Sequence, residues 1–293
     1  MGRVRLRRHD RVVVGSLDVG GQMLHRYARN CIVGSALFMV PLFAGQLALS
    51  LTAFDRFMDL DRSLPGAFGA AAATGTESVL AYLSRLGSGL TAAIVGAYVT
   101  SIVLGHQLGT PARMGTAIRA CIRRLPVIVA AWLVGHSWMF ATSWFATSTS
   151  GGDRVAIFVV GAPFVALLAT LVLMVSPILM TERIGPFAAL RRSAKLARYR
   201  FGTAYWFVCV SFAFGASLQL GISWLPRLAQ STGLVTFGSF GGLAQDLAVQ
   251  VGQLITVPFV AIATAQFYLQ TRVHAEGIDM VIAADRAFGE RVS

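Results

Sequence analysis

The sequence predicts an all-α fold, a polytopic transmembrane helical bundle of about six spans with short cytoplasmic amphipathic helices. Three observations support this class. Of the 293 residues, 55% are hydrophobic and only 13% are charged, and the mean hydropathy is +0.66. That composition leaves more apolar surface than one soluble domain can bury. Long apolar runs recur along the chain, and most of its basic residues fall beside these runs rather than within them.

The formal net charge of +12 would indicate a nucleic-acid partner in a soluble protein. Because the basic residues adjoin apolar runs and follow no aromatic-studded groove, we expect membrane lipid, anionic lipid in particular, and no nucleic acid. A cytoplasmic or membrane protein is a further possible partner. The cysteines, Cys31, Cys121 and Cys209, are far apart and show neither a disulfide framework nor metal-ligand spacing.

The first repeating unit begins with a cytoplasmic basic N-terminus and an interfacial helix over residues 1–30, in which Ser16 is the expected helix cap. The first span runs from Cys31 to about Phe54, long enough for a hydrocarbon core of about 30 Å. The loop from Asp55 to Thr76 is acidic on balance, as outside loops often are. The second span, about Val79 to His106, has small residues at every fourth position, which predict a close helix contact: Ser88, Ala92, Gly96 and Thr100.

The second unit begins with an amphipathic helix near residues 110–124 that starts close to Thr110. The third span runs from Leu125 to about Ser148, and the fourth from Val155 to about Thr181. His136 lies near the middle of the third span, where an ionisable side chain is costly. A proton relay is one interpretation. We favour a neutral histidine hydrogen-bonded across helices, because no second buried acid or base is spaced to pair with it.

The third unit begins with a basic helix over residues 185–201, which Gly185 and Pro186 are expected to start because proline costs nothing in a first turn. At 3.6 residues per turn, its basic residues fall within an arc of roughly 120° and its apolar residues lie opposite. Such a helix is typical of a membrane surface. The candidate lipid- or partner-binding residues of this helix and of the 110–124 helix are Arg191, Arg192, Lys195, Arg198, Arg119, Arg123 and Arg124.

The fifth span runs from Ala204 to Leu225, and the sixth from about Leu243 to Leu269. A small face on the fifth span predicts another close helix contact. Polar residues on the sixth span share one face. Either they line a water-filled path or, as we favour, the aspartate lies at the outer interface and the glutamines form hydrogen bonds with neighbouring helices. The small face consists of Ala213, Ser217 and Gly221, and the polar face of Asp246, Gln250 and Gln253.

The order is therefore a basic helix and two spans, three times over, which predicts a threefold helix-plus-hairpin pseudo-repeat. The six-span domain covers residues 31–270, and residues 271–293 form a cytoplasmic tail. Placing both termini and the basic connections on one side collects most of the 25 lysines and arginines there. By the positive-inside rule, that side is cytoplasmic.

Three segments, MVPLF in the first span, GPFAALRRSAKL in the basic helix of the third unit and the ending FYLQTRVHAEGIDM, carry a family resemblance. They resemble a broad family of bacterial, largely actinobacterial, six-span proteins related to the membrane domain of glycerophosphodiester phosphodiesterases. An acidic residue common in that family is replaced by Gln270 or Thr271. Family members typically close the last span with an aromatic pair, an arginine and Glu-Gly-x-Asp, matched here by Phe267, Tyr268, Arg272, Glu276, Gly277 and Asp279.

The resemblance implies a fold and a location, the bacterial cytoplasmic membrane with both termini inside. The sequence contains no counterpart of the hydrolase domain fused to some relatives, so phosphodiesterase activity is not carried over. Within the candidate tail motif of Arg272, Glu276, Gly277 and Asp279, the two carboxylates either hold a cation or pair with Arg272 and the inner arginines. We favour the pairing.

Known catalytic patterns are missing from the sequence. It contains no GxxxxGK[ST] phosphate loop, HExxH metal helix or GxSxG elbow, and its five histidines are scattered. We therefore expect no enzymatic activity, cofactor or metal. The leading hypothesis is a scaffold or accessory subunit in envelope or lipid-related processes. The alternative is a permease subunit of a transporter that needs a separate ATPase, and an intramembrane enzyme ranks third.

Overall fold

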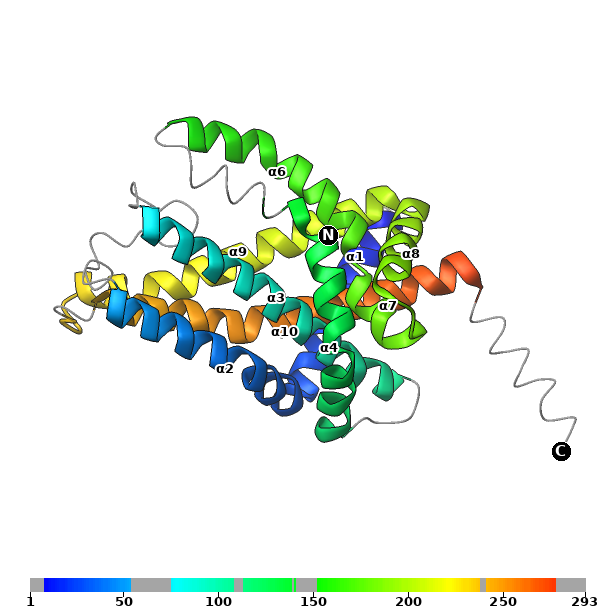
Figure 1. Cartoon of the computed structure of the whole chain (residues 1–293), viewed down its shortest axis with the longest axis horizontal. Coiled ribbons are helices and arrows are strands. Elements are labelled where there is room, and N and C mark those ends of the chain that lie inside the picture. The colour runs from blue at the N-terminus through cyan, green and yellow to red at the C-terminus, as the bar shows by residue number, and fades with distance from the viewer. Residues whose placement is uncertain are drawn as a thin grey trace, which may run out of the picture.

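The computed structural model describes residues 8–53, 75–107, 113–138, 140, 152–237 and 241–277, and these residues form helices and their short connections (Figure 1). The all-α prediction is confirmed for them. In chain order the helices are α1 (Arg8–Arg26), α2 (Ala28–Ala53), α3 (Gly75–Gln107), α4 (Met114–Gly135), α6 (Gly152–Val172), α7 (Val175–Glu182), α8 (Pro186–Tyr199), α9 (Phe201–Ser231) and α10 (Gly241–Glu276).

Within these residues, five segments are long and apolar enough to cross a membrane. They correspond to the predicted first, second, fourth, fifth and sixth spans, and the protein is therefore a multi-pass membrane protein. The fourth span consists of α6 and α7 with a break at residues 173–174. The five segments are Ala28–Gly45, Leu86–Gln107, Pro163–Glu182, Phe201–Ser231 and Leu243–Glu276.

The predicted third span is not among the five. Its first part, from Leu125 to Gly135, continues the preceding basic helix as the single helix α4. The predicted amphipathic helix near residues 110–124 and the start of the predicted span are therefore not separate, and Pro126 lies inside the helix. A proline is tolerated there because neighbouring helices and local adjustments can satisfy the freed backbone groups. Residues 141–148 of the predicted span lie outside the described residues.

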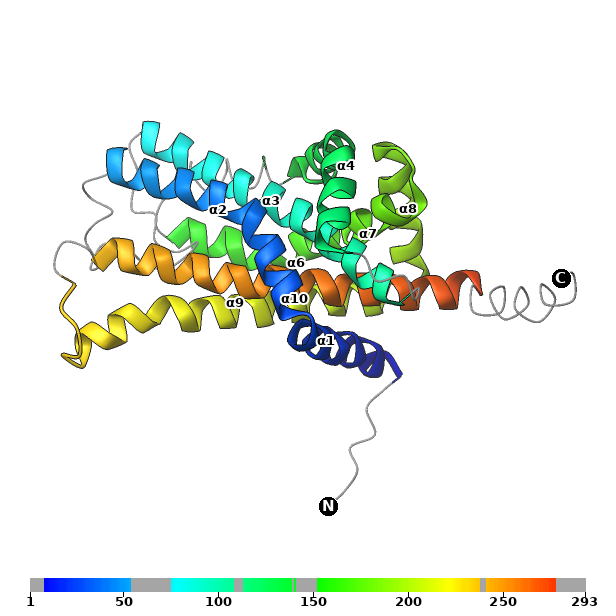
Figure 2. The same ribbon diagram turned by 90° about the horizontal axis from the view of Figure 1, so that it is seen from below.

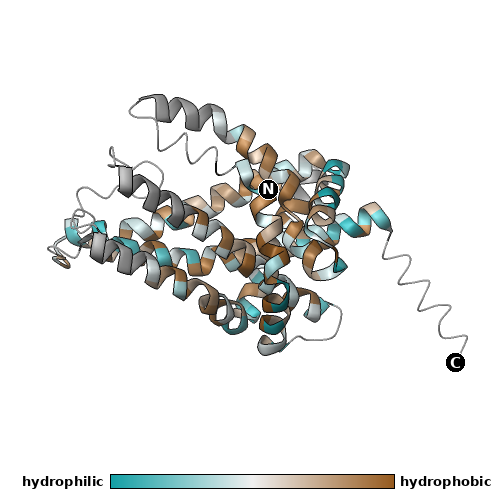
Figure 3. Cartoon of the chain, viewed as in Figure 1, coloured by the Kyte–Doolittle hydropathy of each residue, from teal (hydrophilic) through white to brown (hydrophobic). Residues whose placement is uncertain are grey.

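The long helices α2, α3, α9 and α10 run side by side along the bundle, whereas α1, α4 and α8 lie across one end of it (Figures 1 and 2). The C-terminal end of α10 lies at that same end. The end of α2, the start of α3, the end of α9 and the start of α10 lie at the opposite end. Hydrophobic residues dominate the middle of the bundle, and hydrophilic residues gather on α8 and the end of α10 (Figure 3). The first and third units thus follow the predicted order of a crossing helix and a hairpin.

Two of the predicted helix starts are resolved by the structure. Gly185 is extended and Pro186 occupies the first turn of α8, as predicted. Ser16 is not a cap, because α1 begins at Arg8 and Ser16 lies inside it. Its hydroxyl donates to the Val12 carbonyl at 2.9 Å, and the residue is fully buried. The valines before Ser16 extend the apolar side of α1, which prolongs the helix. The predicted start at Thr110 lies outside the described residues.

The centre of the bundle is organised around α10, which packs against α9, α1, α3 and α2. Phe207 and Phe267 stack with their ring centroids 4.7 Å apart and join α9 to α10. Between α2 and α3, the buried Tyr98 hydroxyl donates to the Asn30 carbonyl at 2.7 Å. A Cβ on Gly34 would lie only 1.9 Å from that hydroxyl oxygen, so this crossing requires glycine.

The small face predicted on α9 is wrong as a contact within this chain. Ala213, Ser217 and Gly221 are all exposed. The face that α9 turns to α10 instead carries Gly215, where an added Cβ would come within 3.1 Å of Thr256 Cγ2. The neighbouring large residues decide the outcome, because burial of Phe207 fixes the rotation of α9 about its axis.

Candidate functional site

The basic helix α8 is held on the bundle by its apolar face. Its buried residues are Ala189, Ser193, Leu196 and Ala197. The Ser193 hydroxyl donates to the Leu171 carbonyl at 2.8 Å and accepts from the Met174 backbone N–H at 3.2 Å. These two bonds satisfy backbone groups that the break between α6 and α7 would leave unpaired. The charged side of α8 therefore faces outward, with Arg191, Lys195 and Arg198 exposed.

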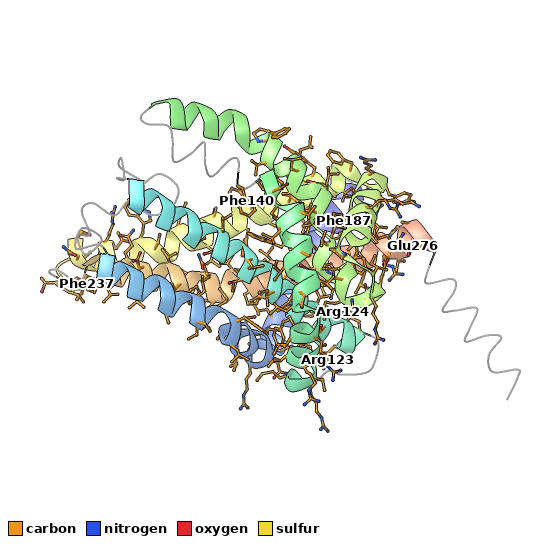
Figure 4. All side chains as sticks on the ribbon, viewed as in Figure 1. Arg123, Arg124, Phe140, Phe187, Phe237 and Glu276 are labelled. Atoms are coloured by element: carbon orange, nitrogen blue, oxygen red, sulfur yellow. The ribbon has the colours of Figure 1, made fainter. Side chains whose placement is uncertain are left out.

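On α4, the predicted basic residues separate into two kinds. Arg119 and Arg123 are exposed, whereas the half-buried Arg124 donates to the Leu179 carbonyl and ties α4 to α7 (Figure 4). Cys121 lies on the buried side of the helix, with its sulfur 3.6 Å from the Ile94 carbonyl oxygen. Burial raises the pKa of the Cys121 thiol to about 11, so the thiol is protonated near neutral pH.

Ion pairs join the ends of α7, α8 and α10. The Arg192 guanidinium donates to Glu182 at 3.2 Å and also pairs with Glu276. The Arg272 Nε donates to Glu276 Oε2 at 3.0 Å, and the Tyr268 hydroxyl donates to Glu182 Oε1 at 3.1 Å. Two carboxylates thus balance two guanidinium groups. We call Glu182, Arg192, Arg272 and Glu276 the ion-pair cluster; Figure 4 shows its member Glu276 at the end of α10, close to α8.

Two residues of the tail motif, Arg272 and Glu276, belong to this cluster. Both Glu276 oxygens are engaged by arginines, as the favoured interpretation of the motif expected. Gly277 has a φ of +60° and donates its backbone N–H to the Val273 carbonyl at 3.0 Å, which ends α10 in the left-handed conformation that glycine adopts without strain. Asp279 lies outside the described residues. Among the described residues, no group of three or more His, Cys, Asp or Glu side chains is placed to hold a metal.

The five remaining predicted basic residues are exposed and lie on two helices, α4 and α8, at the crossing-helix end of the bundle. Arg124 and Arg192 do not belong to this group, because one binds a carbonyl and the other lies in the ion-pair cluster. Both guanidinium groups are bound to partners within the protein. We define the basic end surface as Arg119 and Arg123 of α4 with Arg191, Lys195 and Arg198 of α8.

His136 lies just after α4 as its C-terminal cap. Its Nδ1 is 3.3 Å from the Trp132 carbonyl oxygen, and its ring stacks on Trp132 with centroids 5.7 Å apart. The expected hydrogen bond across helices is therefore replaced by one within the same helix. The cause is the end of α4 at Gly135, which places the histidine at the C-terminus of its own helix, where its ring and its backbone N–H share the Trp132 carbonyl.

The polar face predicted on α10 is half-buried at all three positions: Asp246, Gln250 and Gln253. A cavity of about 800 Å³ lies on an adjacent side of α10, and none of these three residues lines it. The wall of the cavity comes from α3, α4, α6, α7, α9 and α10. Its volume falls within the range of about 300–1,000 Å³ that is typical of small-molecule sites.

Part of this cavity wall was predicted to be a helix contact. Ala92, Gly96 and Thr100 of the small face on α3 line the cavity. The helix α7 packs on the same part of α3, where Ser176 lies near Gly96 and its hydroxyl donates to the Ala93 carbonyl at 3.4 Å. His136 lines the cavity as well. The small residues themselves were a sequence signal for the cavity. Small residues that face one another across a bundle leave space when no bulky side chain fills it.

Comparison of the chain with protein-family models, with curated proteins and with solved structures found no match in any of the three. The family resemblance therefore remains a prediction that rests on its three short segments.

Proposed function

We propose that this protein is an accessory or scaffold module of a bacterial cytoplasmic membrane, and that its basic end surface binds the anionic headgroups of the inner leaflet. The observation that carries the proposal is the division of the predicted basic residues. Arg124 and Arg192 bind partners within the protein, whereas the five members of the basic end surface are exposed on helices that lie across the end of the bundle.

The geometry suits a membrane surface. A helix that lies across the end of a spanning bundle presents its charges at one level, as an interfacial amphipathic helix does. Each basic residue near an anionic leaflet contributes about 1 kcal/mol of attraction. For the three residues on α8, additive contributions would amount to about 3 kcal/mol, and salt should weaken the attraction because the Debye length shortens.

Thermal stability in nanodiscs tests the proposal. Arg191, Lys195 and Arg198 are replaced by glutamine together, and wild type and variant are compared in zwitterionic and anionic lipid at low and high salt. We expect anionic lipid to stabilise the wild type more than the variant, with the difference shrinking at high salt. The control variant removes the same charge from the opposite side of the predicted topology, with Arg56, Arg62 and Arg227 changed to glutamine.

Equal stabilisation of wild type and the α8 variant by anionic lipid would refute lipid binding by this surface. The basic helices would then be assigned to docking a cytoplasmic protein, as in a permease that uses a separate ATPase. Purification from native membranes separates the two outcomes, because a stoichiometric ATPase accompanies a permease.

A further inference from the structure

The cavity lies within the membrane-spanning part of the bundle. Its wall on α3 runs from Gly89 to Thr100, inside the span Leu86–Gln107, and its walls on α9 and α10 lie inside their spans. Two wall residues on α9, Phe212 and Leu220, are 67% and 42% exposed. Because the surroundings of a spanning helix are acyl chains, the cavity opens sideways to the hydrocarbon of the bilayer.

The wall is mostly apolar, with alanine, glycine, valine and leucine residues prevailing. Two of the hydroxyls on this wall lack a hydrogen-bond partner within the described part of the chain. Ser211 and Thr256 are only 6% and 9% exposed, and their oxygens have no hydrogen-bond partner among the residues that the structure describes. Buried polar groups nearly always have a partner, because an unpaired one has lost its hydration without compensation.

Other hydroxyls on the same wall show how a helix normally satisfies such groups. The Thr100 hydroxyl donates to the Gly96 carbonyl at 2.7 Å, and the Ser223 hydroxyl donates to the Leu220 carbonyl at 2.8 Å. Ser211 and Thr256 make no such bond to their own helices. Both hydroxyls are therefore free to bond to a ligand.

The two hydroxyls belong to neighbouring parts of one helix contact. Gly215 follows Ser211 by one helical turn, and a Cβ on Gly215 would come within 3.1 Å of Thr256 Cγ2. Ser211 and Thr256 thus flank the place where α9 and α10 approach each other closely. A single elongated ligand in the cavity can reach both.

We propose that this cavity binds the hydrocarbon chain of a membrane lipid, and that an oxygen of the same lipid accepts hydrogen bonds from Ser211 and Thr256. The sideways opening selects a molecule dissolved in the bilayer. The apolar wall matches an acyl chain, and the two donors match an acceptor such as an ester carbonyl. This site goes beyond the proposed function, since it requires neither an anionic headgroup nor the basic end surface.

A photoactivatable lipid tests the site. The protein is placed in nanodiscs of zwitterionic phosphatidylcholine that contain a trace of phosphatidylcholine with a diazirine in one acyl chain, and cross-linked peptides are mapped after illumination. We expect cross-links on the cavity wall of α3 and α9. Ala216→Phe, which fills the wall, should lower them at least fivefold, whereas Ala213→Phe, on the exposed side of the same helix, should leave them unchanged.

The hydroxyls provide a second measurement that does not depend on filling the cavity. Native mass spectrometry of the purified protein should find one retained lipid per chain, and the double change Ser211→Ala and Thr256→Val should lower that retention about tenfold. In delipidated protein the same double change should raise the melting temperature, because two unpaired hydroxyls are removed. The combination of weaker lipid retention and higher lipid-free stability is the signature of donors kept for a ligand.

The proposal is overturned if cross-links fall equally in Ala216→Phe and Ala213→Phe, or if the double hydroxyl variant retains as much lipid as the wild type. Occupation by another segment of the chain would give the second result. The cross-linking uses zwitterionic lipid, and the mass spectrometry reports on the two cavity hydroxyls, so loss of the basic end surface should leave both unchanged. Failure of this site and failure of the proposed function are therefore distinguishable.

Discussion

Replacement of Gly34 by alanine should destabilise the protein through a clash with Tyr98. An ideal Cβ at position 34 lies 1.9 Å from the Tyr98 hydroxyl oxygen, 2.2 Å from Cζ and 2.6 Å from Cε1. Ordinary contact begins at 3.4 Å, so the ring or the helix must move by about 1.5 Å. Tyr98 is fully buried, and neighbouring side chains oppose that movement.

The size of the effect follows from two losses. Overpacking a core costs about 1–3 kcal/mol. Displacement of the ring also breaks the bond from the Tyr98 hydroxyl to the Asn30 carbonyl, and a buried hydroxyl left unpaired costs a further 1–3 kcal/mol or so. Alanine recovers about 1 kcal/mol of helix propensity. We expect a net loss of about 1–5 kcal/mol in the free energy of unfolding.

The assay is unfolding of the purified protein in detergent, with Gly45→Ala as the matched control. Gly45 lies on the same helix, is exposed and has open space around its Cβ position, so its replacement should be neutral or slightly stabilising. Adding Tyr98→Leu to Gly34→Ala should recover part of the loss, but Tyr98→Phe should not, because Cζ still clashes. Equal stability of the Gly34→Ala and Gly45→Ala variants would refute the reasoning.

Three more predictions address topology, the ion-pair cluster and a buried thiol. Single cysteines at Ser63 and Thr232 in a cysteine-free background should label from outside intact cells, and labelling only after lysis would reject the orientation. Glu276→Gln should lower the free energy of unfolding by about 1–3 kcal/mol, between the values for exposed and buried ion pairs, because it leaves two arginines short of a partner; Asp18→Asn, which affects an exposed carboxylate, should change stability little, and equal effects would contradict the cluster's role. Cys121, whose pKa is raised to about 11 by burial, should resist alkylation at pH 8 until the protein is unfolded, and rapid labelling of the folded protein would contradict its burial.

Local composition was sufficient to predict much of the fold. Partition into a bilayer depends on the hydropathy of a short segment, so five of the six predicted spans appear as helices of suitable length. The start of α8 could be predicted equally well from the sequence, because the constraint of Pro186 acts within one turn. The exposed positions of Arg191, Lys195 and Arg198 follow from helical periodicity alone.

The predictions that failed concern features set by the rotation of each helix about its axis and by the neighbouring helices that it contacts. The contact face of α9 contains Gly215 rather than Ala213, because burial of the large Phe207 outweighs a local pattern of small residues. The start of the predicted third span lies in α4, a helix that crosses the bundle. Ser16 similarly lies inside α1, where it is buried near α10 rather than capping a helix.

The sequence by itself thus determined that this protein is a helical membrane protein with basic surface helices, because hydropathy and helical periodicity are properties of consecutive residues. Only the tertiary structure determined which partner each polar group has. Arg192 reaches Glu276 across 84 positions of sequence, and the cavity with its two unpaired hydroxyls exists only where several helices meet. Such pairings depend on distances between segments far apart in the chain, and no local pattern contains those distances.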